Sequence, residues 1–252
     1  MSNRVALVTG AAQGIGKGIA VSLAERGFRV AVADLNQATA EEAAKEITAA
    51  GGEAIAVPID VTDTASVEAA VAAVERELGP IEVVVNNAGW DDFMPFVATS
   101  ENFWDKVLDL NFKGALRVVK TVLPGMQERG FGRIVNIGSD AGRVGSSLEA
   151  VYSGAKGGII AFTKTLAREV ATKGITANTV CPGPTDTPAL RKFAAGSGGD
   201  AEKVIAGMTR AVPMKRLGTP ADIGPAVAFF ASDGAGFVTG QTLSVSGGLT
   251  MA

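Results

Sequence analysis

The sequence contains no histidine and only one cysteine, Cys181, among its 252 residues. Without histidine, the chain has no Ser-His-Asp or Cys-His catalytic centre and lacks the commonest zinc ligand. A single cysteine cannot form an intrachain disulfide or a multi-cysteine metal centre. We therefore predict a protein without a metal site, whose chemistry depends on other side chains.

Long apolar runs and a one-sided charge are also missing. The net charge is -3, with acidic and basic residues interspersed and no basic stretch, so we expect no nucleic-acid partner. No apolar stretch approaches the length that crosses a bilayer, and the first one, Val5–Val8, is too short for a signal peptide. We expect a cytoplasmic protein that does not bind membranes.

Short β-branched runs alternate along the chain with longer amphipathic stretches. The predicted strands are Val5–Thr9, Arg29–Asp34, Ala54–Pro58, Ile81–Val85, Arg133–Gly138, Thr176–Cys181 and Thr242–Ser246. The predicted helices are Gly14–Arg26, Gln37–Ala50, Asp63–Leu78, Glu101–Glu128, Ala150–Thr172 and Ala221–Ser232. Apolar strands separated by helices indicate an α/β fold with a parallel sheet covered on both faces, built as one domain over residues 1–252.

The segment from Pro182 to Gly218 breaks this alternation because it is rich in proline and glycine. It follows the end of a predicted strand, and its middle, Ala195–Gly199, is rich in glycine. We predict a substrate lid around residues 184–212. The alternative is a surface insertion without a functional role.

A glycine-rich turn, Thr9–Gly16, joins the first predicted strand to the first predicted helix. Glycines at positions 10, 14 and 16 permit a tight turn, a close approach of a diphosphate and close packing of the helix. The helix N-terminus supplies free N–H groups to phosphate. A P-loop is excluded because Gly18 stands where that motif needs serine or threonine.

Asp34 ends the second predicted strand. A carboxylate there accepts hydrogen bonds from the adenosine ribose and repels a 2′-phosphate. Neither Gln13 nor Leu35 carries a positive charge that would attract that phosphate. We therefore predict NAD as the cofactor. Asp60 follows the third strand, where it would lie at the adenine edge or, alternatively, form an Asx turn or helix cap.

The only tyrosine of the chain, Tyr152, precedes Lys156 by four residues. On a helix these side chains lie on the same face. A nearby ammonium favours the phenolate, so we expect Lys156 to lower the pKa of Tyr152 from about 10. An ordinary surface pair is the alternative that these two residues alone allow.

Taken together, these features resemble the short-chain dehydrogenase/reductase family over nearly the whole chain. The matching motifs, in order, are the Thr9–Gly16 turn, Asn86-Asn87-Ala88-Gly89, Asn111, Ser139 and Tyr152-x-x-x-Lys156. The resemblance implies a doubly wound Rossmann fold with seven parallel strands and a homotetramer.

The resemblance also implies roles for individual residues. Tyr152 is similar to the acid–base that exchanges a proton with the alcohol or ketone, and Lys156 to the residue that lowers its pKa and binds the nicotinamide ribose. Ser139 resembles the hydroxyl that holds the substrate oxygen, and Asn111 the residue that anchors a proton-relay water. The expected cofactor-binding residues are Gly10, Gln13, Gly14, Ile15, Gly16, Asp34, Leu35, Asp60, Val61, Asn87, Ala88, Gly89, Tyr152, Lys156, Pro182, Gly183, Thr185 and Thr187.

Several loop stretches are similar to those of bacterial 2-hydroxycyclohexanecarboxyl-CoA dehydrogenases, which oxidise a ring alcohol beside a CoA thioester. We therefore expect a ring-bearing secondary alcohol and a partly apolar pocket. The expected pocket residues are Trp90, Ser139, Arg143, Val144, Leu148, Tyr152 and Leu190. Phe93 belongs either to this wall or to the core, as does Leu148. Arg143 and the lid residues Arg191, Lys192 and Arg210 either rim the entrance for a CoA phosphate or are solvated surface charges.

Other functions compete with this prediction. Within the same reaction class they are an aryl secondary-alcohol (1-aryl-ethanol) dehydrogenase and a 3-oxoacyl-[acyl-carrier-protein] reductase, the latter disfavoured because Asp34 argues against NADPH. A nucleotide sensor without catalysis is disfavoured because Asn111, Ser139, Tyr152 and Lys156 are all present. A dehydratase or epimerase on the same scaffold would form no net NADH from an alcohol.

Overall fold

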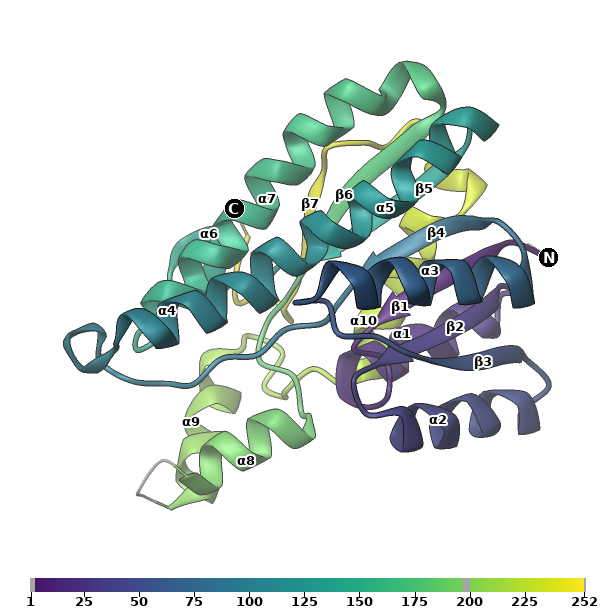
Figure 1. The fold of residues 1–252 in the computed structure, drawn as a ribbon. Coiled ribbons are helices and arrows are strands. Elements are labelled where there is room, and N and C mark those ends of the chain that lie inside the picture. The colour runs from purple at the N-terminus through teal and green to yellow at the C-terminus, as the bar shows by residue number, and fades with distance from the viewer. Residues whose placement is uncertain (1–2, 197–199, 252) are drawn as a thin grey trace.

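Seven parallel strands form one sheet in the computed structural model, which describes residues 3–196 and 200–251 (Figure 1). The strands are β1 (Val5–Thr9), β2 (Arg29–Asp34), β3 (Glu53–Pro58), β4 (Ile81–Asn86), β5 (Gly132–Ile137), β6 (Ile175–Pro182) and β7 (Thr242–Val245). Their order across the sheet is β3-β2-β1-β4-β5-β6-β7. The predicted Rossmann-type architecture is therefore confirmed, and all seven strands lie close to their predicted positions.

The central strands are apolar on both faces because each face is covered. In β1, Ala6 and Val8 pack into one hydrophobic cluster while Val5 and Leu7 pack into the other, and all four are fully buried. Successive side chains of a strand point to opposite faces, so a continuous apolar run indicates a sheet between two layers of helices.

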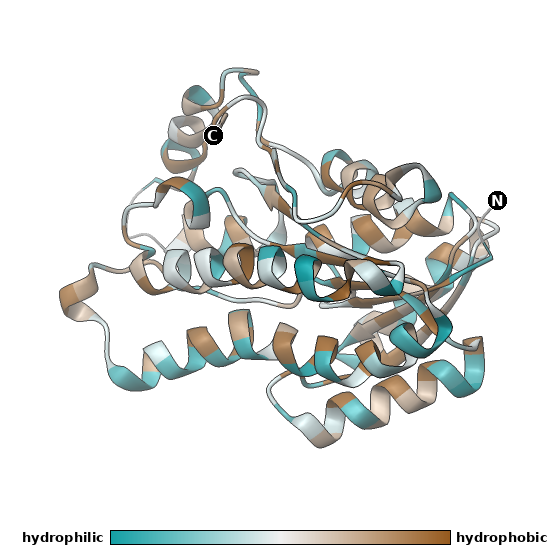
Figure 2. Cartoon of the chain, turned by 90° about the horizontal axis from the view of Figure 1, so that it is seen from above, coloured by the Kyte–Doolittle hydropathy of each residue, from teal (hydrophilic) through white to brown (hydrophobic). Residues whose placement is uncertain are grey.

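Helices cover both faces of the sheet, and their apolar stripes turn inward (Figure 2). One layer contains α1 (Gly14–Ala24), α2 (Gln37–Ala49) and α10 (Pro220–Ala231). The other contains α3 (Thr64–Leu78), α5 (Gly114–Arg129) and α7 (Ala150–Val170). In the described part of the chain, no helix has both the length and the apolar composition needed to cross a bilayer.

The predicted helix Glu101–Glu128 is interrupted in the structure. It consists of α4 (Glu101–Leu108), a π-helical turn (Asp109–Lys113) and α5. Ser100 caps α4 by accepting a hydrogen bond from the Phe103 N–H. A π-turn inserts one residue into the helical repeat and is frequent at functional sites. Hydrophobic periodicity does not resolve such an insertion, and the sequence therefore did not reveal it.

Two helices occupy the predicted lid segment, α8 (Pro188–Gly196) and α9 (Ala201–Ala211). The glycine-rich middle extends to residues 197–199, which lie outside the described residues. Figure 1 shows this helical pair below the carboxyl ends of the strands, away from the two main layers. The remaining short helices are η1 (Phe96–Ala98), α6 (Ala141–Val144), η3 (Ala171–Lys173) and η4 (Asp233–Ala235).

The strand order reverses between β1 and β4, because β2 and β3 lie on one side of β1 and β4 to β7 on the other. Loops that leave these two strands diverge to opposite faces of the sheet. In open parallel sheets, ligands bind in the crevice at this switch point, outside the carboxyl ends of the strands. The predicted cofactor-binding residues fall at this edge.

Candidate active site

The turn between β1 and α1 requires glycine for reasons internal to the protein. Gly10 and Gly14 have φ angles of +63° and +57°, in the left-handed region that favours glycine. A Cβ atom on Gly16 would stand 2.1 Å from the Gly10 carbonyl oxygen, so no side chain fits there. The predicted tight turn is thus observed, and the N-terminus of α1 faces the switch point, where its N–H groups suit a diphosphate.

The Asp34 carboxylate lies beside this turn, as the sequence predicts. Its two oxygens accept hydrogen bonds from the backbone N–H groups of Ala12 (3.1 Å) and Asn36 (3.0 Å). These bonds fix the carboxylate next to the glycine turn, and its remaining lone pairs can accept ribose hydroxyls. Leu35 is 74% exposed and Gln13 is also exposed at the same edge.

Asp60 forms a local turn, which is the alternative that the sequence left open. Its Oδ1 accepts hydrogen bonds from the backbone N–H and the hydroxyl of Thr62. The same two bonds hold the pKa of the Asp60 carboxyl below its usual value. The next residue, Val61, is buried, and a side chain at Gly114 would collide with it.

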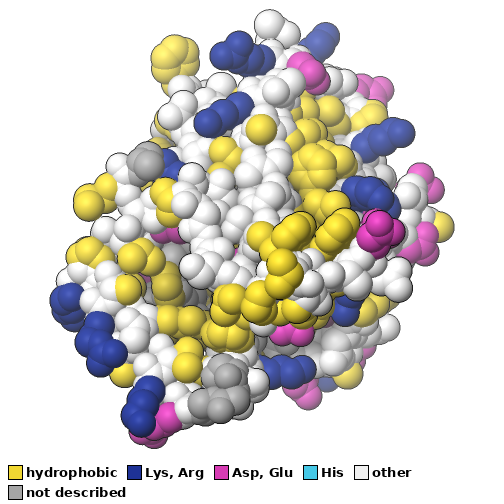
Figure 3. All heavy atoms as spheres, turned by 90° about the vertical axis from the view of Figure 1, so that its left-hand side faces the viewer, with side chains coloured by type: hydrophobic (Ala, Val, Ile, Leu, Met, Phe, Trp, Pro, Cys, Tyr) yellow, Lys and Arg dark blue, Asp and Glu magenta, His cyan; other side chains and the backbone are white. Residues whose placement is uncertain are grey.

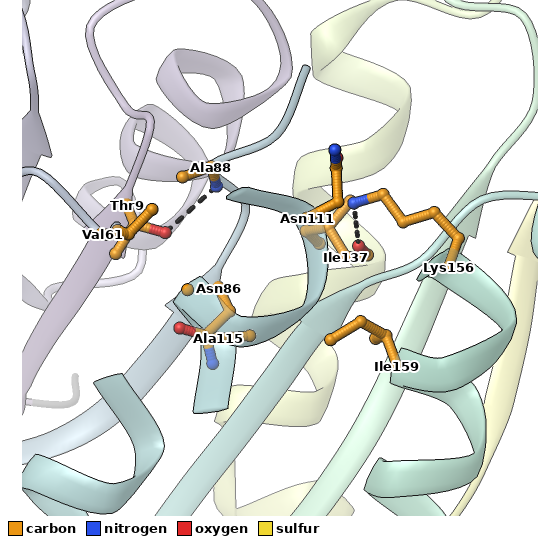
Figure 4. A pocket seen from close by; sticks show the side chains of 10 residues that line it. Thr9, Val61, Asn86, Ala88, Asn111, Ala115, Ile137, Lys156 and Ile159 are labelled. Carbon is orange, nitrogen blue, oxygen red and sulfur yellow. Dashed lines mark hydrogen bonds between the residues drawn. The ribbon is translucent and has the colours of Figure 1, made fainter. Parts of the chain in front are cut away.

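Thr9 joins the glycine turn to the segment after β4, a role that the sequence did not reveal. Its hydroxyl accepts hydrogen bonds from the N–H groups of Asn87 and Ala88, each at 3.1 Å, and Figure 4 draws the bond to Ala88. The Asn87 side chain in turn donates to the carbonyl oxygens of Thr9 and Gly10. The Asn87–Gly89 segment is therefore anchored to the turn that the cofactor prediction uses.

Asn111 sits in the π-helical turn and is buried, with 2% of its surface exposed. Its Nδ2 donates to the carbonyl oxygens of Trp90 (2.6 Å) and Val107 (2.9 Å), and its Oδ1 accepts from the Trp90 N–H. The side-chain amide therefore anchors the backbone of the loop after β4. This contact is a role beyond the relay water that the family resemblance implies.

Lys156 lies in α7 and is almost fully buried, with 4% exposed. Its Nζ donates to the Ile137 carbonyl oxygen at 2.9 Å and stands 5.5 Å from the centroid of the Tyr152 ring. The predicted proximity of the two side chains is therefore observed. Burial lowers the pKa of Lys156 to about 8.

Tyr152 departs from the sequence expectation. Its pKa is raised rather than lowered, first because of burial and then because the carboxyls of Glu149 and Asp91 lie nearby. A hydrogen bond with Ser139 opposes this shift. The expectation considered only the ammonium charge, but Lys156 directs its ammonium to a backbone carbonyl and two carboxyls act on the phenol.

Ser139 follows β5 and lies beside the tyrosine. Its hydroxyl accepts a hydrogen bond from the Ala141 N–H at 3.1 Å, at the start of α6. The residue is half-buried and shares a hydrogen bond with Tyr152. Ser139, Tyr152 and Lys156 thus come together from two elements, as predicted.

A small cavity lies between the two sides of this site (Figure 4). It has room for about one water molecule, and its lining includes Thr9, Asn86, Asn111 and Lys156. The Nδ2 of Asn86 donates to Asn136 in β5, whose amide donates to Thr163 in α7. This buried chain of side-chain amides connects the sheet to the lysine helix, and no pattern in the sequence indicates it.

The predicted residues of the nicotinamide end lie where β6 meets the lid. Thr185 is buried and its hydroxyl donates to the Gly183 carbonyl oxygen at 2.9 Å, just beyond Pro182. The Thr187 hydroxyl accepts from the Leu190 N–H at the start of α8. A side chain on Gly14 would come within 3.6 Å of Thr187, so the lid begins beside the glycine turn.

Aromatic side chains pack together between the loop after β4, α4 and the lid. The Trp90 ring packs edge-on against Phe103 at 6.0 Å, with the Lys106 ammonium 3.8 Å from its centroid. Phe93 stacks on Phe193 of α8 with 3.7 Å between ring centroids. This stack ties the loop after β4 to the lid, and Phe93 is half-buried.

One end of the molecule carries an apolar surface. Figure 3, which faces the left-hand side of Figure 1, shows apolar side chains gathered at the end of the molecule near α4, α6 and the lid. The most exposed of them are Phe96, Val97, Val144, Leu148 and Met214. Leu190 of the predicted pocket is half-buried. Val144 and Leu148 are therefore exposed, and Leu148 is not a core residue.

Two of the predicted basic rim residues are engaged within the protein. Arg143 donates to the Ser244 hydroxyl at 2.7 Å, and Ser244 donates to Asp140. Arg191 forms a two-bond ion pair with Asp186. Because these charges already have partners, the interpretation of Arg143 and Arg191 as an open phosphate site is not supported.

The fold and the site define a dinucleotide-binding oxidoreductase with a tyrosine–lysine centre. A family model described as enoyl-(acyl carrier protein) reductase matches residues 10–250. The chain belongs to the short-chain dehydrogenase/reductase family, which uses a nicotinamide cofactor.

Relatives of known activity match over almost their full length. The 3-oxoacyl-[acyl-carrier-protein] reductase FabG of Vibrio cholerae is 40% identical, covering 100% of this chain and 99% of the relative. The acetoacetyl-CoA reductase of Shinella zoogloeoides is 41% identical, covering 98% of each. The crystal structure of a variant of the actinorhodin polyketide ketoreductase with NADPH matches with a TM-score of 0.93 and 40% identity, over 98% of this chain and 97% of that one.

Proposed function

We propose that the protein is an NAD-dependent oxidoreductase that interconverts a secondary alcohol and a ketone on an acyl thioester. The observation that carries this proposal is the convergence of Ser139, Tyr152 and Lys156 at the switch-point edge, in a chain that has no histidine. Reduction of a ketone by hydride transfer needs a bound cofactor, an oriented carbonyl and one proton donor. These residues would orient the substrate carbonyl and donate the proton.

We assign the following roles to the residues of the site. When bound, a nicotinamide cofactor would supply the carbon that gives or takes the hydride. Ser139 donates a hydrogen bond to the substrate oxygen, and the Tyr152 hydroxyl gives it a proton during reduction or takes one during oxidation. Because the pKa of Tyr152 is raised, the hydroxyl is protonated at neutral pH. Lys156 places a positive charge beside it, which stabilises the phenolate that remains after donation.

The substrate class follows from the names of the relatives and from the apolar surface near α4, α6 and the lid (Figure 3). The FabG relative is named for 3-oxoacyl groups on acyl carrier protein, and the Shinella relative for acetoacetyl-CoA. A 2-hydroxycyclohexanecarboxyl-CoA carries its hydroxyl on the same carbon relative to the thioester. We therefore propose a 3-hydroxyacyl or 3-oxoacyl thioester, with a ring-bearing acyl group such as 2-hydroxycyclohexanecarboxyl-CoA as the narrower assignment.

The proposed preference for NAD depends on Asp34. Its carboxylate is fixed beside the glycine turn, where it would accept the ribose hydroxyls and repel a 2′-phosphate. The solved polyketide ketoreductase relative holds NADPH, so this preference would set the chain apart from that enzyme. We also propose that the protein assembles as a homotetramer, as the family resemblance implies.

An absorbance assay of NADH formation tests the function directly. Linear 3-hydroxyacyl-CoA thioesters, 2-hydroxycyclohexanecarboxyl-CoA, the corresponding free acid and 1-aryl-ethanols are compared with NAD and with NADP. We expect the thioesters to give a higher kcat/KM than the free acid, and the ring thioester to exceed the linear ones. Higher activity on 1-aryl-ethanols would instead identify an aryl alcohol dehydrogenase. Absence of NADH from every alcohol would contradict the proposed reaction.

A further inference from the structure

Asp91 carries a carboxyl group that is covered by the protein and has no hydrogen-bond partner at either oxygen. The Asp92 backbone N–H approaches it closely enough to influence the carboxyl without completing a bond of normal geometry. Buried polar atoms in proteins are nearly always paired, so an unpaired carboxyl within an active site requires an explanation.

The surrounding loops hold Asp91 in place. The N–H and the carbonyl of the preceding residue, Trp90, are both hydrogen-bonded to the Asn111 side chain. Further along the loop, the Met94 N–H donates to the Leu148 carbonyl oxygen at 3.0 Å. Leu148 adopts an unusual φ of +68°, and Glu149 follows it at the start of α7. The loop of Asp91 is therefore fixed at both ends, beside the beginning of the catalytic helix.

The charged groups that act on the pKa of Asp91 are Glu149 from the start of α7, the exposed Asp92 from the same loop, and Lys156 from α7. Asp91 and Glu149 in turn act on Tyr152, and Asp91 also acts on Lys156. The site thus contains two carboxyls as well as the tyrosine–lysine pair.

Burial, together with the charges of Glu149 and Asp92, raises the pKa of Asp91 to about 7. The carboxyl therefore changes its charge in the neutral range. The chain has no histidine that would titrate there. Burial also raises the pKa of Glu149, and it lowers the pKa of Lys156 to about 8.

We propose that Asp91 is a positioning residue that acts through Tyr152: together with Glu149, its negative charge disfavours the phenolate and so raises the pH at which the site changes from donating a proton to accepting one. This inference rests on the proposed function, because it assumes that Tyr152 is the acid–base. A carboxylate near a phenol disfavours the phenolate, whereas a neutral amide of the same size does not.

The test is the pH dependence of kcat/KM for alcohol oxidation, in which activity rises as Tyr152 loses its proton. Asp91→Asn removes the charge and keeps the size, so this rising limb should move to lower pH by about one unit. Glu149→Gln should move it in the same direction, and Asp91→Glu should restore the wild-type position. Glu169→Gln is the control, because Glu169 is an exposed carboxyl further along α7 and should leave the limb unmoved.

A second measurement follows the ionisation of Tyr152 directly. Because the chain contains one tyrosine, the ultraviolet absorbance of phenolate in the NAD complex reports Tyr152 alone. Its midpoint should fall by the same amount in Asp91→Asn, a change that a merely structural role for Asp91 would not cause. A limb and a midpoint that stay in place in Asp91→Asn would overturn the inference, and so would an equal shift in Glu169→Gln.

Two variants distinguish an error in this inference from an error in the proposed function. Substantial activity in Tyr152→Phe would remove the acid–base assignment on which both depend. An inactive Tyr152→Phe combined with an unshifted Asp91→Asn would leave the reaction standing and reject only the role of Asp91.

Discussion

A tyrosine and a lysine one helical turn apart share a buried site in which neither has its usual proton affinity. Burial disfavours the charged form of each group, so it raises the pKa of Tyr152 and lowers that of Lys156 to about 8. As a result of the two shifts, a protonated Tyr152 and an uncharged Lys156 can be present together at moderately alkaline pH. A positive charge on a bound oxidised nicotinamide would act on the tyrosine in the opposite direction to Asp91 and Glu149.

Removal of the Tyr152 hydroxyl tests the acid–base at the residue scale. We expect Tyr152→Phe to lose about 10³-fold in kcat, since general acid–base catalysis contributes roughly 10²- to 10⁴-fold. NAD binding, measured by the quenching of tryptophan fluorescence, should persist because the ring and its packing are kept. A variant that retains most of its kcat would show that another group exchanges the proton.

Substitution of Asp34 tests the proposed cofactor preference in a similar way. We expect Asp34→Ala to lower kcat/KM for NAD by about 10-fold, as a charge-assisted hydrogen bond to the ribose is lost, and to raise the relative use of NADP. The comparison is the ratio of kcat/KM for the two cofactors in the wild type and the variant. A wild type that already uses NADP better than NAD would contradict the role given to this carboxylate.

At the scale of elements, the glycine turn before α1 is built so tightly that a single methyl group would disturb it. The Gly16→Ala methyl would stand 2.1 Å from the Gly10 carbonyl oxygen and 2.5 Å from the Asn87 side chain. We expect a loss of about 1–3 kcal/mol in the free energy of unfolding, as overpacking typically costs, and weaker NAD binding. Chemical denaturation and cofactor titration measure the two effects.

Gly154→Ala is the matched control for this substitution. Gly154 lies in α7, and a methyl group there meets nothing within 4 Å. Alanine is the better helix former, so this variant should be neutral or more stable by up to about 1 kcal/mol. Equal destabilisation by both variants would mean that the predicted clash at Gly16 does not explain its cost.

The lid is a second element with a specific attachment. The Phe93–Phe193 stack joins α8 to the loop after β4, and such pairs contribute about 0.5–1.5 kcal/mol beyond their buried area. We expect Phe193→Ala to raise KM for the acyl thioester by roughly 2- to 12-fold with a smaller change in kcat. Phe229→Ala in α10, which removes a half-exposed ring remote from the lid, should leave KM unchanged. A KM that stays constant in Phe193→Ala would show that the stack does not support the substrate site.

At the scale of the whole molecule, the two helical layers and the sheet converge on one edge. The first layer brings the glycine turn, and the second brings Asn111 and α7. The buried amides of Asn86 and Asn136 link neighbouring strands to α7 beneath the site. The position of the active site is therefore a consequence of the strand order.

For the whole molecule, we predict assembly into a homotetramer. Around β7 and the chain end, Phe237, Leu243 and Met251 expose apolar surface, and Phe237 is fully exposed. Apolar side chains of this kind are common at interfaces between subunits. Light scattering should give a mass of about four times the chain mass of 25.5 kDa, and Phe237→Ser should weaken the assembly. A monomeric mass for the wild type would contradict the proposed tetramer.

The order and type of the main elements could be predicted from the chain alone. Strands that are buried on both faces must be apolar throughout, and a turn such as Thr9–Gly16 must contain glycine, so both leave signals in the local sequence. The same holds for the Tyr152–Lys156 spacing, because residues four apart share a helix face. These features depend on neighbours along the chain.

The electrostatics and the internal bonding of the site became visible only in the folded molecule. Asp91, which helps to raise the pKa of Tyr152, comes from the loop after β4, and Lys156 turns to the Ile137 carbonyl, so no local spacing reveals the balance. Likewise, Arg143 is held by Ser244, a residue 101 positions later. Proton affinity in a buried site depends on everything within a few ångströms, and those neighbours are brought together by the fold rather than by the order of residues.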